Sequence, residues 1–290
     1  MFNIQETDAC RRLIKLAIEE DLGTDGDLTS RALIPPEQIG NAVFVSRGPG
    51  ILAGVAAASL VFETVDPRVI FRPILRDRAE ITAGSHIASV SGSLRSILTA
   101  ERTALNFLQH LSGVATLTSR YVQAIAGLPC QVLDTRKTTP GWRLPEKYAV
   151  RCGGGHNHRM GLYDAILIKD NHIAAVRNRS DADFAVVKAT IDLAYSSVPW
   201  MIEVENFDQL DSALSCGPQV ILLDNMSLDD LHRAVARRNQ KNPKVLLEAS
   251  GGINLANVRA VAETGVDRIS IGALTHSAPA LDIALDYVQK

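Results

Sequence analysis

Basic side chains gather in two short polar segments of this sequence and at the end of an apolar run that follows them. Residues 134–141 read DTRKTTPG, residues 153–159 read GGGHNHR, and Lys169 closes the run AILIK. Arginine forks match carboxylate and phosphate oxygens, and lysine supplies a point charge. One such residue is usually a solvated surface charge, but a series at successive run ends predicts a site for a multiply anionic ligand. Its expected members are Arg136, Lys137, His158, Arg159 and Lys169.

These residues would also suit two other chemistries. His156 and His158 look like a metal-binding pair, but no third ligand is apparent, so His158 is assigned to anion contact and His156 is left unassigned. Lys169 could instead form a Schiff base, as in a barrel lyase, and neighbouring cations would help it to lose its proton. Borohydride trapping with a carbonyl substrate would separate the two roles of Lys169.

Two acidic residues follow later apolar runs. Glu203 lies in WMIEVEN and Asp224 lies in VILLDN, 21 residues further along. Neighbouring strands would bring these carboxylates together beside the basic residues. Mg²⁺ prefers a few carboxylates together with substrate phosphate oxygens, so the pair predicts a Mg²⁺ site. The alternative is that each carboxylate forms a structural ion pair with one of the cations.

Small residues follow the last two apolar runs. Ser250–Gly252 closes KVLLEASGG, and Ile271–Ala273 closes DRISIGA. Small side chains let backbone N–H groups approach a phosphate after the final strands of a β/α barrel. The simpler interpretation is ordinary turn formation, which glycine serves anywhere.

The elements that position these groups repeat along the second part of the chain. The last four apolar runs begin at residues 200, 219, 244 and 267, so they are spaced by 19, 25 and 23 residues. Segments compatible with helices lie among the runs, at residues 181–195, 227–239 and 254–264. This strand–helix–strand rhythm is typical of a parallel sheet.

A doubly wound sheet and a β/α barrel share this rhythm. Almost every run places ionisable residues at its C-terminal end, among them Asp134, Lys169, Glu203, Asp224 and Glu248. A barrel gathers all those ends on one face, whereas a doubly wound sheet uses only two or three of them. The pattern therefore favours a barrel.

The chain has a different character before about residue 127. Apolar residues at helical spacing near residues 13–20 are followed by Gly23, which predicts a helix that stops there. Residues 41–46 and 69–74 have strand patterns. Residues 94–125 form a long amphipathic pattern, with Leu98, Leu105, Leu108, Leu111 and Val114 at threes and fours, read as one or two helices that could break near Gly113.

Composition excludes several classes of protein. The net charge of −2 gives no global attraction to nucleic acid or to an anionic membrane. Four isolated cysteines without a C-x-x-C pair fit reduced thiols better than disulfides or zinc. No secretory signal pattern is present, and the longest apolar run, 12 residues from 51 to 62, is too short to span a bilayer. We expect a cytoplasmic protein.

Taken together, the motifs resemble the quinolinate phosphoribosyltransferase family. The resemblance runs from about residue 19 to 285, and DTRKTTPG and HNHR are its most specific blocks. Other matching segments are EEDLGTDGDLTS (19–30), ERTALNF (101–107), IKDNH (168–172), EVEN (203–206), LDN (223–225), EASGG (248–252) and residues 265–273.

The resemblance implies an α/β fold with an N-terminal α/β open sandwich domain and an incomplete C-terminal β/α barrel. The first domain would cover residues 1–115, with 275–290 returning to it, and the barrel residues 116–274. The resemblance also implies a homodimer or higher homo-oligomer in which Arg102 reaches across the interface into the neighbour's site. The substrates would be quinolinate and phosphoribosyl pyrophosphate, with Mg²⁺ as cofactor.

Residue roles follow from the same resemblance. Around the quinolinate carboxylates it places Arg102, Arg136, Lys137, His158, Arg159 and Lys169, and Thr135 joins the substrate-binding set. Glu203 and Asp224 would hold ribose hydroxyls and the metal–pyrophosphate, the metal partly through water or substrate. The 5′-phosphate is assigned to Ser250, Gly251, Gly252, Ile271, Gly272 and Ala273. The expected catalytic residues are Lys137, Lys169, Glu203 and Asp224.

Three rivals remain at this point. A paralogous phosphoribosyltransferase-like protein of molybdate transport would share the fold, but the intact set of cations argues against it. A Schiff-base barrel lyase would use Lys169 as its nucleophile. A protein that only senses pyridine carboxylates would have little use for Glu203 and Asp224.

Overall fold

The computed structural model describes residues 2–177 and 184–288, which fall into two compact units. The first unit contains residues 1–119, 137–155 and 274–290, and the second contains residues 120–136 and 156–273.

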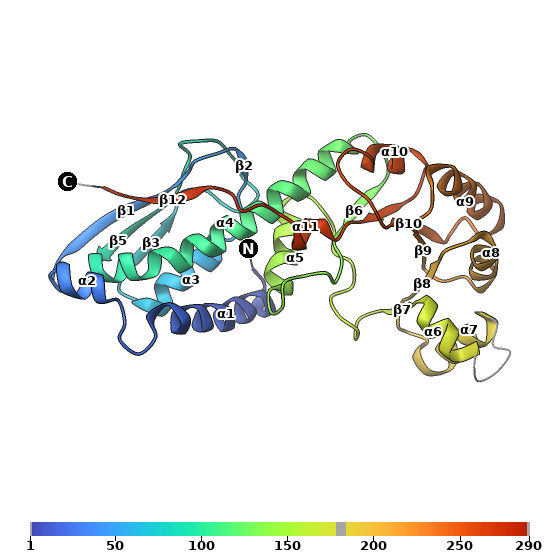
Figure 1. Ribbon diagram of the computed structural model, residues 1–290, viewed down its shortest axis with the longest axis horizontal. Coiled ribbons are helices and arrows are strands. Elements are labelled where there is room, and N and C mark those ends of the chain that lie inside the picture. The colour runs from blue at the N-terminus through green and yellow to red at the C-terminus, as the bar shows by residue number, and fades with distance from the viewer. Residues whose placement is uncertain (1, 178–183, 289–290) are drawn as a thin grey trace. The chain divides into compact units, whose positions relative to one another are not determined.

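The first unit is built on an antiparallel sheet with the strand order β12-β1-β5-β3. These strands are β1 (Ile39–Ser46), β3 (Ile70–Pro73), β5 (His86–Ser93) and β12 (Ile283–Tyr287), and β2 (Gly50–Ile51) and β4 (Glu80–Ile81) form a separate two-stranded ribbon. Figure 1 shows helices α3 (Val55–Val65) and α4 (Leu94–Ala124) along this sheet. The other helices are α1 (Ile4–Leu22), α2 (Leu28–Leu33), α5 (Arg143–Cys152) and α11 (Ala273–His276), of which the last begins in the second unit.

Apolar side chains of the sheet and helix α3 form the core of the first unit. Phe44 of β1, Phe62 of α3 and Phe71 of β3 lie with ring centroids 5.7–6.0 Å apart, as aromatic rings prefer. Helix α1 begins with a capping box between Asn3 and Glu6 and ends at Gly23, which has a φ of 49°. The predicted stop at Gly23 is therefore confirmed.

The long amphipathic pattern folds as a single helix, α4, without a break at Gly113. Gly113 has another purpose, because a Cβ added there would lie 2.2 Å from the carbonyl oxygen of Pro279. The C-terminal segment is also bonded to α4 through Gln109, which accepts from the N–H of Leu281 and donates to the carbonyl of Ile283. Of the predicted apolar stripe, Leu98 is exposed and the other four residues are buried.

The second unit contains a six-stranded parallel sheet with the order β6-β11-β10-β9-β8-β7. Its strands are β6 (Gln131–Leu133), β7 (Ile166–Ile168), β8 (Trp200–Val204), β9 (Val220–Asp224), β10 (Leu246–Ser250) and β11 (Arg268–Ser270). Strands β7 to β11 follow one another in chain order and β6 lies beyond β11. A doubly wound sheet would reverse direction, so this order is that of a barrel left open between β6 and β7.

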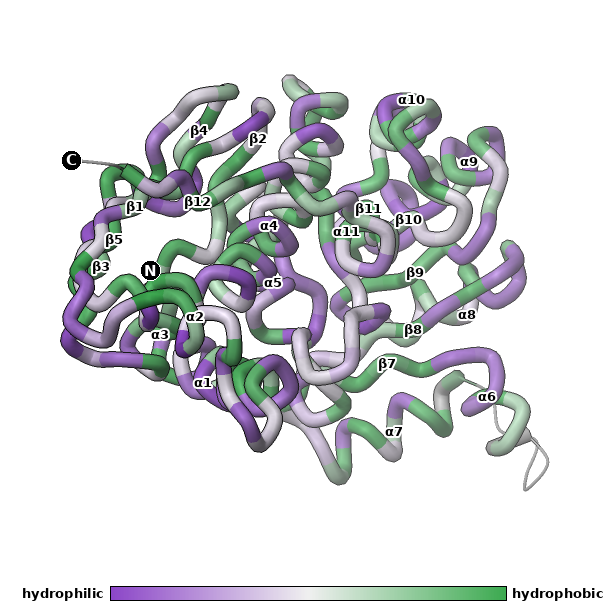
Figure 2. The backbone as a smooth tube through the Cα atoms, turned by 60° about the vertical axis from the view of Figure 1, so that its left-hand side comes forward, coloured by the Kyte–Doolittle hydropathy of each residue, from purple (hydrophilic) through white to green (hydrophobic). Residues whose placement is uncertain are grey.

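Helices connect the strands of the second unit. They are α6 (Asp170–Arg177), α7 (Phe184–Tyr195), α8 (Phe207–Cys216), α9 (Leu228–Lys241) and α10 (Val258–Glu263). Residues 181–183 of the expected helix at 181–195 lie outside the described residues, and the rest corresponds to α7. The expected helix at 254–264 is shorter than predicted, because Asn257 accepts from the N–H of Asn254 and holds the first residues in a turn. Figure 2 shows β7 and β9 as hydrophobic, which is usual for strands of a parallel sheet.

We predict that Gly113→Ala destabilises the protein even though alanine is the better helix former. The helix preference is worth about 1 kcal/mol, but the new methyl group would collide with the Pro279 carbonyl, and overpacking costs about 1–3 kcal/mol. Urea unfolding would measure the loss. Gly48→Ala is the control, because a Cβ at Gly48 meets nothing within 4 Å. Equal or higher stability of Gly113→Ala would contradict the close approach.

Candidate active site

Strand register places several polar side chains on one face of the parallel sheet. Glu203 and Glu248 are both level with Leu222, and Ser250 is level with Asp224. Residues in register on parallel strands point to the same side, and alternate residues share it. On that face lies an apolar cluster of Ala165, Met201, Val220 and Leu222, with Leu167 against it. Glu203 and Glu248 therefore lie at the level of Leu222, and Asp224 and Ser250 lie further toward the C-terminal ends of the strands.

Glu203 and Lys169 form an ion pair in this site. Lys169 Nζ lies 2.5 Å from Glu203 Oε2, and Glu203 is the more buried partner, at 15% exposed against 43%. Lys169 follows β7 and Glu203 lies in β8, so the pairing joins neighbouring strands. In this structure Glu203 thus has the structural ion pair that the sequence left open as an alternative to metal binding.

Asp224 ends β9 and accepts two hydrogen bonds. Its Oδ1 accepts from Ser250 Oγ and its Oδ2 from Asn225 Nδ2, each at 2.8 Å. Glu203 and Asp224 lie on adjacent strands, as expected from the sequence. No three His, Cys, Asp or Glu side chains gather as a cation site anywhere in the described part of the chain. Two carboxylates alone still fit Mg²⁺, which takes much of its coordination from substrate phosphates and water.

The HNHR segment lies along the edge strand β6. His156 forms a parallel bridge with Leu133, and its N–H donates to the carbonyl of Val132. Asp134, which is fully buried, then accepts from Asn157 Nδ2 at 2.5 Å and from the N–H of His158 at 2.9 Å. The HNHR segment is thereby bound to the sheet by its own backbone and by one carboxylate.

Arg159 and Arg136 lie close enough for their charges to interact. Burial, and then the like charge of Arg136, lowers the pKa of Arg159 from its ordinary value, while Asp164 opposes the shift. The Arg159 guanidinium donates to the carbonyl of Ala165 at 3.0 Å, whereas Arg136 is exposed. Two guanidinium groups whose charges interact suit an anion with more than one negative oxygen.

His158 is more enclosed than an exposed anion contact would be. It is 7% exposed, its Nδ1 accepts the N–H of Arg159 at 2.8 Å, and its Nε2 lies 3.4 Å from Glu248 Oε1. Both ring nitrogens are thus directed to groups of the protein. Direct contact of His158 with a ligand stays a prediction.

The turns predicted to receive a phosphate differ from each other. Gly251 and Gly252 have φ values of 90° and 62°, and both are exposed. In the other turn, the N–H of Ile271 donates to the carbonyl of Leu133 at 2.9 Å, so this amide belongs to the sheet. Gly272 and Ala273 follow it and are half-buried. The roles of both turns stay predictions.

The remaining predicted residues fall in either unit. Arg102 and Lys137 belong to the first unit, where both are exposed, and Thr135 belongs to the second and is half-buried. Their contribution to the site therefore also stays a prediction. Arg268 of β11 is level with Glu248 of β10 and is not among the predicted residues. A charged residue at the start of the run RISIGA was the available signal.

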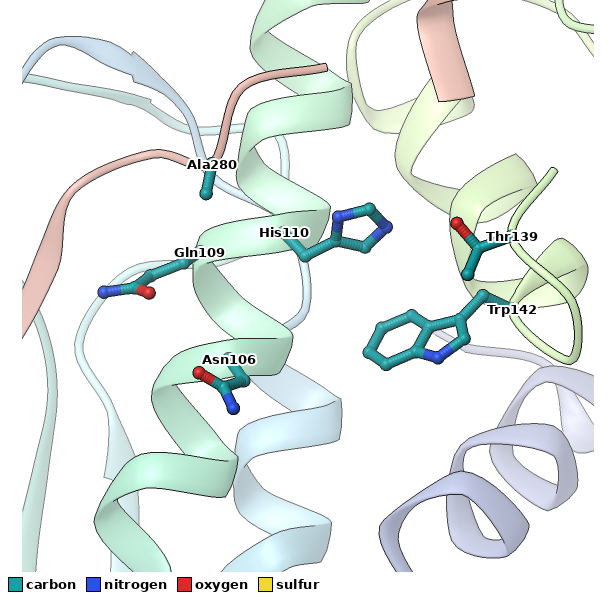
Figure 3. Close-up of a pocket in the computed structure, with 6 residues that line it drawn as sticks. All are labelled: Asn106, Gln109, His110, Thr139, Trp142 and Ala280. Atoms are coloured by element: carbon teal, nitrogen blue, oxygen red, sulfur yellow. The ribbon is translucent and has the colours of Figure 1, made fainter. Parts of the chain in front are cut away.

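A cavity of about 300 Å³ in the first unit was also missed. It is lined by Asn106, Gln109, His110, Thr139, Trp142 and Ala280. Figure 3 shows His110 of α4 pointing toward Thr139 and Trp142 on the opposite side. His110 Nε2 lies 2.9 Å from the buried Glu146, which also accepts the N–H of Thr139. The spacing of Asn106, Gln109 and His110 along one helix face was the sequence signal.

Two family models match the chain. The model of the quinolinate phosphoribosyl transferase N-terminal domain matches residues 27–112, and that of the C-terminal domain matches residues 114–286. The chain belongs to the quinolinate phosphoribosyltransferase family. The family resemblance expected from the motifs is confirmed.

Relatives of the family are similar to the chain over nearly its whole length. A nicotinate-nucleotide pyrophosphorylase [carboxylating] of Mycobacterium leprae is 45% identical and covers 97% of this chain and 98% of its own. A quinolinate phosphoribosyltransferase [decarboxylating] of Nicotiana glauca is 41% identical, with coverage of 94% and 81%. The solved nicotinate-nucleotide pyrophosphorylase of Francisella tularensis superposes with a TM-score of 0.90 at 40% identity and covers 97% of each chain. The predicted two-domain fold, with an antiparallel sheet and a parallel β/α sheet, is confirmed.

We predict that Gly251→Ala perturbs the turn after β10 more than Gly252→Ala does. Both glycines have positive φ, but a Cβ at Gly251 would lie 2.1 Å from Asn225 Oδ1, whereas one at Gly252 meets nothing within 4 Å. Strain at positive φ costs about 1 kcal/mol at both sites, and only Gly251→Ala adds the clash. Urea unfolding of the two variants would compare them. Equal losses would contradict the packing of Asn225 against this turn.

Proposed function

We propose that this protein transfers the phosphoribosyl group of phosphoribosyl pyrophosphate to quinolinate and releases CO₂. The products are nicotinate mononucleotide, pyrophosphate and CO₂, and the reaction belongs to NAD biosynthesis. One observation carries the proposal: relatives named for this activity are similar to the chain from end to end, at up to 45% identity for the relatives compared. The enzyme class is then a pentosyltransferase.

The arginines Arg136 and Arg159 support the binding of a pyridine dicarboxylate. Each guanidinium can donate two parallel hydrogen bonds to one carboxylate. Arg159 is partly withdrawn from water and lies beside another positive charge, so an incoming anion relieves repulsion as well as gaining hydrogen bonds. We assign the two quinolinate carboxylates to this pair, with Lys169, His158 and Thr135 around them.

Lys169 and Glu203 have linked roles in the proposal. In the free protein the carboxylate of Glu203 neutralises the ammonium of Lys169. When substrates bind, Lys169 can turn to a substrate anion and leave Glu203 to accept from the ribose hydroxyls. The same ion pair disfavours the Schiff-base alternative, because that chemistry requires a neutral amine and Glu203 stabilises the ammonium.

The metal requirement follows from the charge of the leaving group. We propose that Glu203 and Asp224 hold Mg²⁺, partly through water or substrate, as these carboxylates lie on adjacent strands of one sheet face. When bound there, Mg²⁺ would supply positive charge to stabilise the leaving pyrophosphate. Ser250 donates to Asp224 and keeps that carboxylate oriented. The turns at 250–252 and 271–273 are proposed to receive the 5′-phosphate.

The chemistry needs no covalent nucleophile from the protein. The quinolinate nitrogen forms a bond to C1 of the ribose while the bond from C1 to pyrophosphate breaks. The nitrogen becomes a pyridinium cation, which can accept electrons when the adjacent C–CO₂⁻ bond breaks. CO₂ leaves, and the carbon takes a proton in its place. The part of the protein is to orient both substrates, to stabilise charge and to keep water away.

We also propose a homodimer or higher homo-oligomer and a cytoplasmic location. Arg102 is exposed on α4, and we propose that it completes the quinolinate site of a neighbouring subunit. All four cysteines lie among the described residues and none forms a disulfide, which suits a reducing compartment. Within residues 2–177 and 184–288, no helix has the length and apolar character that crossing a bilayer requires.

Substrate-dependent CO₂ release tests the function directly. We expect CO₂ from carboxyl-labelled quinolinate only when phosphoribosyl pyrophosphate and Mg²⁺ are present, and loss of the signal with excess chelator. Nicotinate is the control acceptor, because it lacks the carboxylate that is lost. Turnover that ignores quinolinate would disprove the proposal and favour a transport-linked paralogue or a sensor protein.

Replacing Arg159 by alanine is expected to raise the KM for quinolinate by about 10- to 100-fold, since a hydrogen bond to a charged group is worth about 1.5–3 kcal/mol. Arg136→Ala is expected to act in the same way. Arg233→Ala, which removes an exposed arginine paired with Asp230 on α9, is the control. A near-normal quinolinate KM in both site variants would count against the assigned pocket.

Arg102→Ala is expected to abolish most activity alone and to be rescued by mixing. If Arg102 acts in a neighbouring subunit's site, a hybrid of Arg102→Ala with the barrel variant Glu203→Ala contains one site in which both residues are intact. Refolding equal amounts together is then expected to restore up to about a quarter of wild-type activity, as random pairing makes half of the dimers hybrid. Activity no higher than that of the two variants refolded separately would refute sharing.

A further inference from the structure

Glu248 is a charged residue that the proposed reaction does not use directly. It is the third of five residues in β10 and is 0% exposed. Its side chain points to the same face as Glu203 and lies level with Arg268 of β11. A carboxylate withdrawn from water is costly unless charged or hydrogen-bonding groups surround it. The groups around Glu248 therefore indicate its purpose.

The surroundings keep Glu248 ionised. Burial alone would raise its pKa, but the neighbouring His158, Arg268 and Ser270 together lower that pKa below its ordinary value. His158 Nε2 lies 3.4 Å from Oε1 and Arg268 Nε lies 3.1 Å from Oε2, which are ion-pair distances without the geometry of a hydrogen bond. Glu248 is thus a carboxylate at neutral pH.

The contacts of His158 define which nitrogen carries its proton. Nδ1 accepts the backbone N–H of Arg159 at 2.8 Å, so it has no proton of its own. In the neutral ring the proton is then on Nε2, which faces Glu248. A carboxylate that selects the tautomer of a histidine also orients its ring, as metal and catalytic sites repeatedly show. The ring in turn binds the backbone of Arg159.

The same backbone stretch is secured from its other side. Asp134 accepts the N–H of His158 and the side chain of Asn157, and Arg159 itself donates to the carbonyl of Ala165. Two fully buried carboxylates from different strands therefore hold the segment that ends in Arg159. Asp134 secures its backbone from β6, and Glu248 secures the histidine ring from β10.

We propose that Glu248 is a positioning residue for the dicarboxylate-binding pair Arg136 and Arg159, acting through the ring of His158 rather than by touching the substrate. This inference rests on the proposed function for the identity of the substrate. Glu248 orients the His158 ring, and the ring accepts from the N–H of Arg159 and so holds the Arg159 backbone in place. The Arg159 guanidinium is thereby positioned near Arg136. The expected consequence is selective: recognition of quinolinate depends on Glu248, whereas recognition of phosphoribosyl pyrophosphate depends on it much less.

The kinetic test uses Glu248→Gln, which keeps the shape of the side chain and removes its charge. We expect the KM for quinolinate to rise about tenfold and the KM for phosphoribosyl pyrophosphate to change less than about twofold, with Glu248→Asp recovering part of the loss. Glu263→Gln, which removes an exposed carboxylate paired with Arg259, is the matched control. An equal change in both KM values, or no change, would overturn the proposal. If Glu248→Gln does not fold, the same two KM values are compared between Glu248→Asp and the wild type.

A spectroscopic test on the wild-type protein is independent of turnover. In ¹⁵N-histidine-labelled protein, the His158 ring is expected to show an unprotonated Nδ1 and a protonated Nε2 near neutral pH, assigned by its loss in His158→Gln. A proton on Nδ1 would overturn the proposal even if the kinetics agreed. If the wild-type protein shows the expected tautomer but no quinolinate-dependent turnover, the proposed function is wrong and the positioning of the His158 ring by Glu248 still stands.

Discussion

Negative charge buried on one face of the parallel sheet is the constraint on which the rest of the site depends. Strands of a parallel sheet are covered on both sides, so a carboxylate among them must be given partners. On that face Glu203 has Lys169, and Glu248 has His158 and Arg268. Just after β6, Asp134 has the backbone of His158 and the side chain of Asn157. Lys169 and His158 belong to the predicted site, so satisfying the carboxylates also places these two residues.

The same arrangement explains how one site can suit the free protein and its substrates. Cations at a binding site repel one another when no anion is present, and burial together with the charge of Arg136 lowers the pKa of Arg159. A nearby carboxylate, Glu203, limits this cost for Lys169. Under the proposed function, the substrate anions supply the compensation for Arg136 and Arg159, and an exchangeable pair such as Lys169–Glu203 can release its cation to them. The more enclosed Glu248 has no such freedom, which suits positioning.

Sequence patterns predicted the elements better than their details. Gly23 ended a helix as expected, whereas Gly113 did not break one, because its missing side chain serves the approach of Pro279 rather than a change of backbone direction. The sequence pattern predicts Glu248 at a strand end with the other ionisable groups, yet it lies inside β10 and is buried. In both cases the residue type indicated correctly that the position is unusual. The physical reason depends on residues that are distant in the sequence and adjacent in the fold.

The amino-acid sequence by itself determined the family, the β/α rhythm and most of the ionisable residues of the site, because apolar periodicity and polar run ends are local properties of a chain. Tertiary structure decided the one-directional strand order with its opening between β6 and β7, and the pairing of β12 with β1. It also decided which cation faces which carboxylate. These depend on strand register, where one residue's shift exchanges the two faces of a sheet, and on contacts such as Arg159 with Ala165 and Glu248 with His158 that no local pattern encodes.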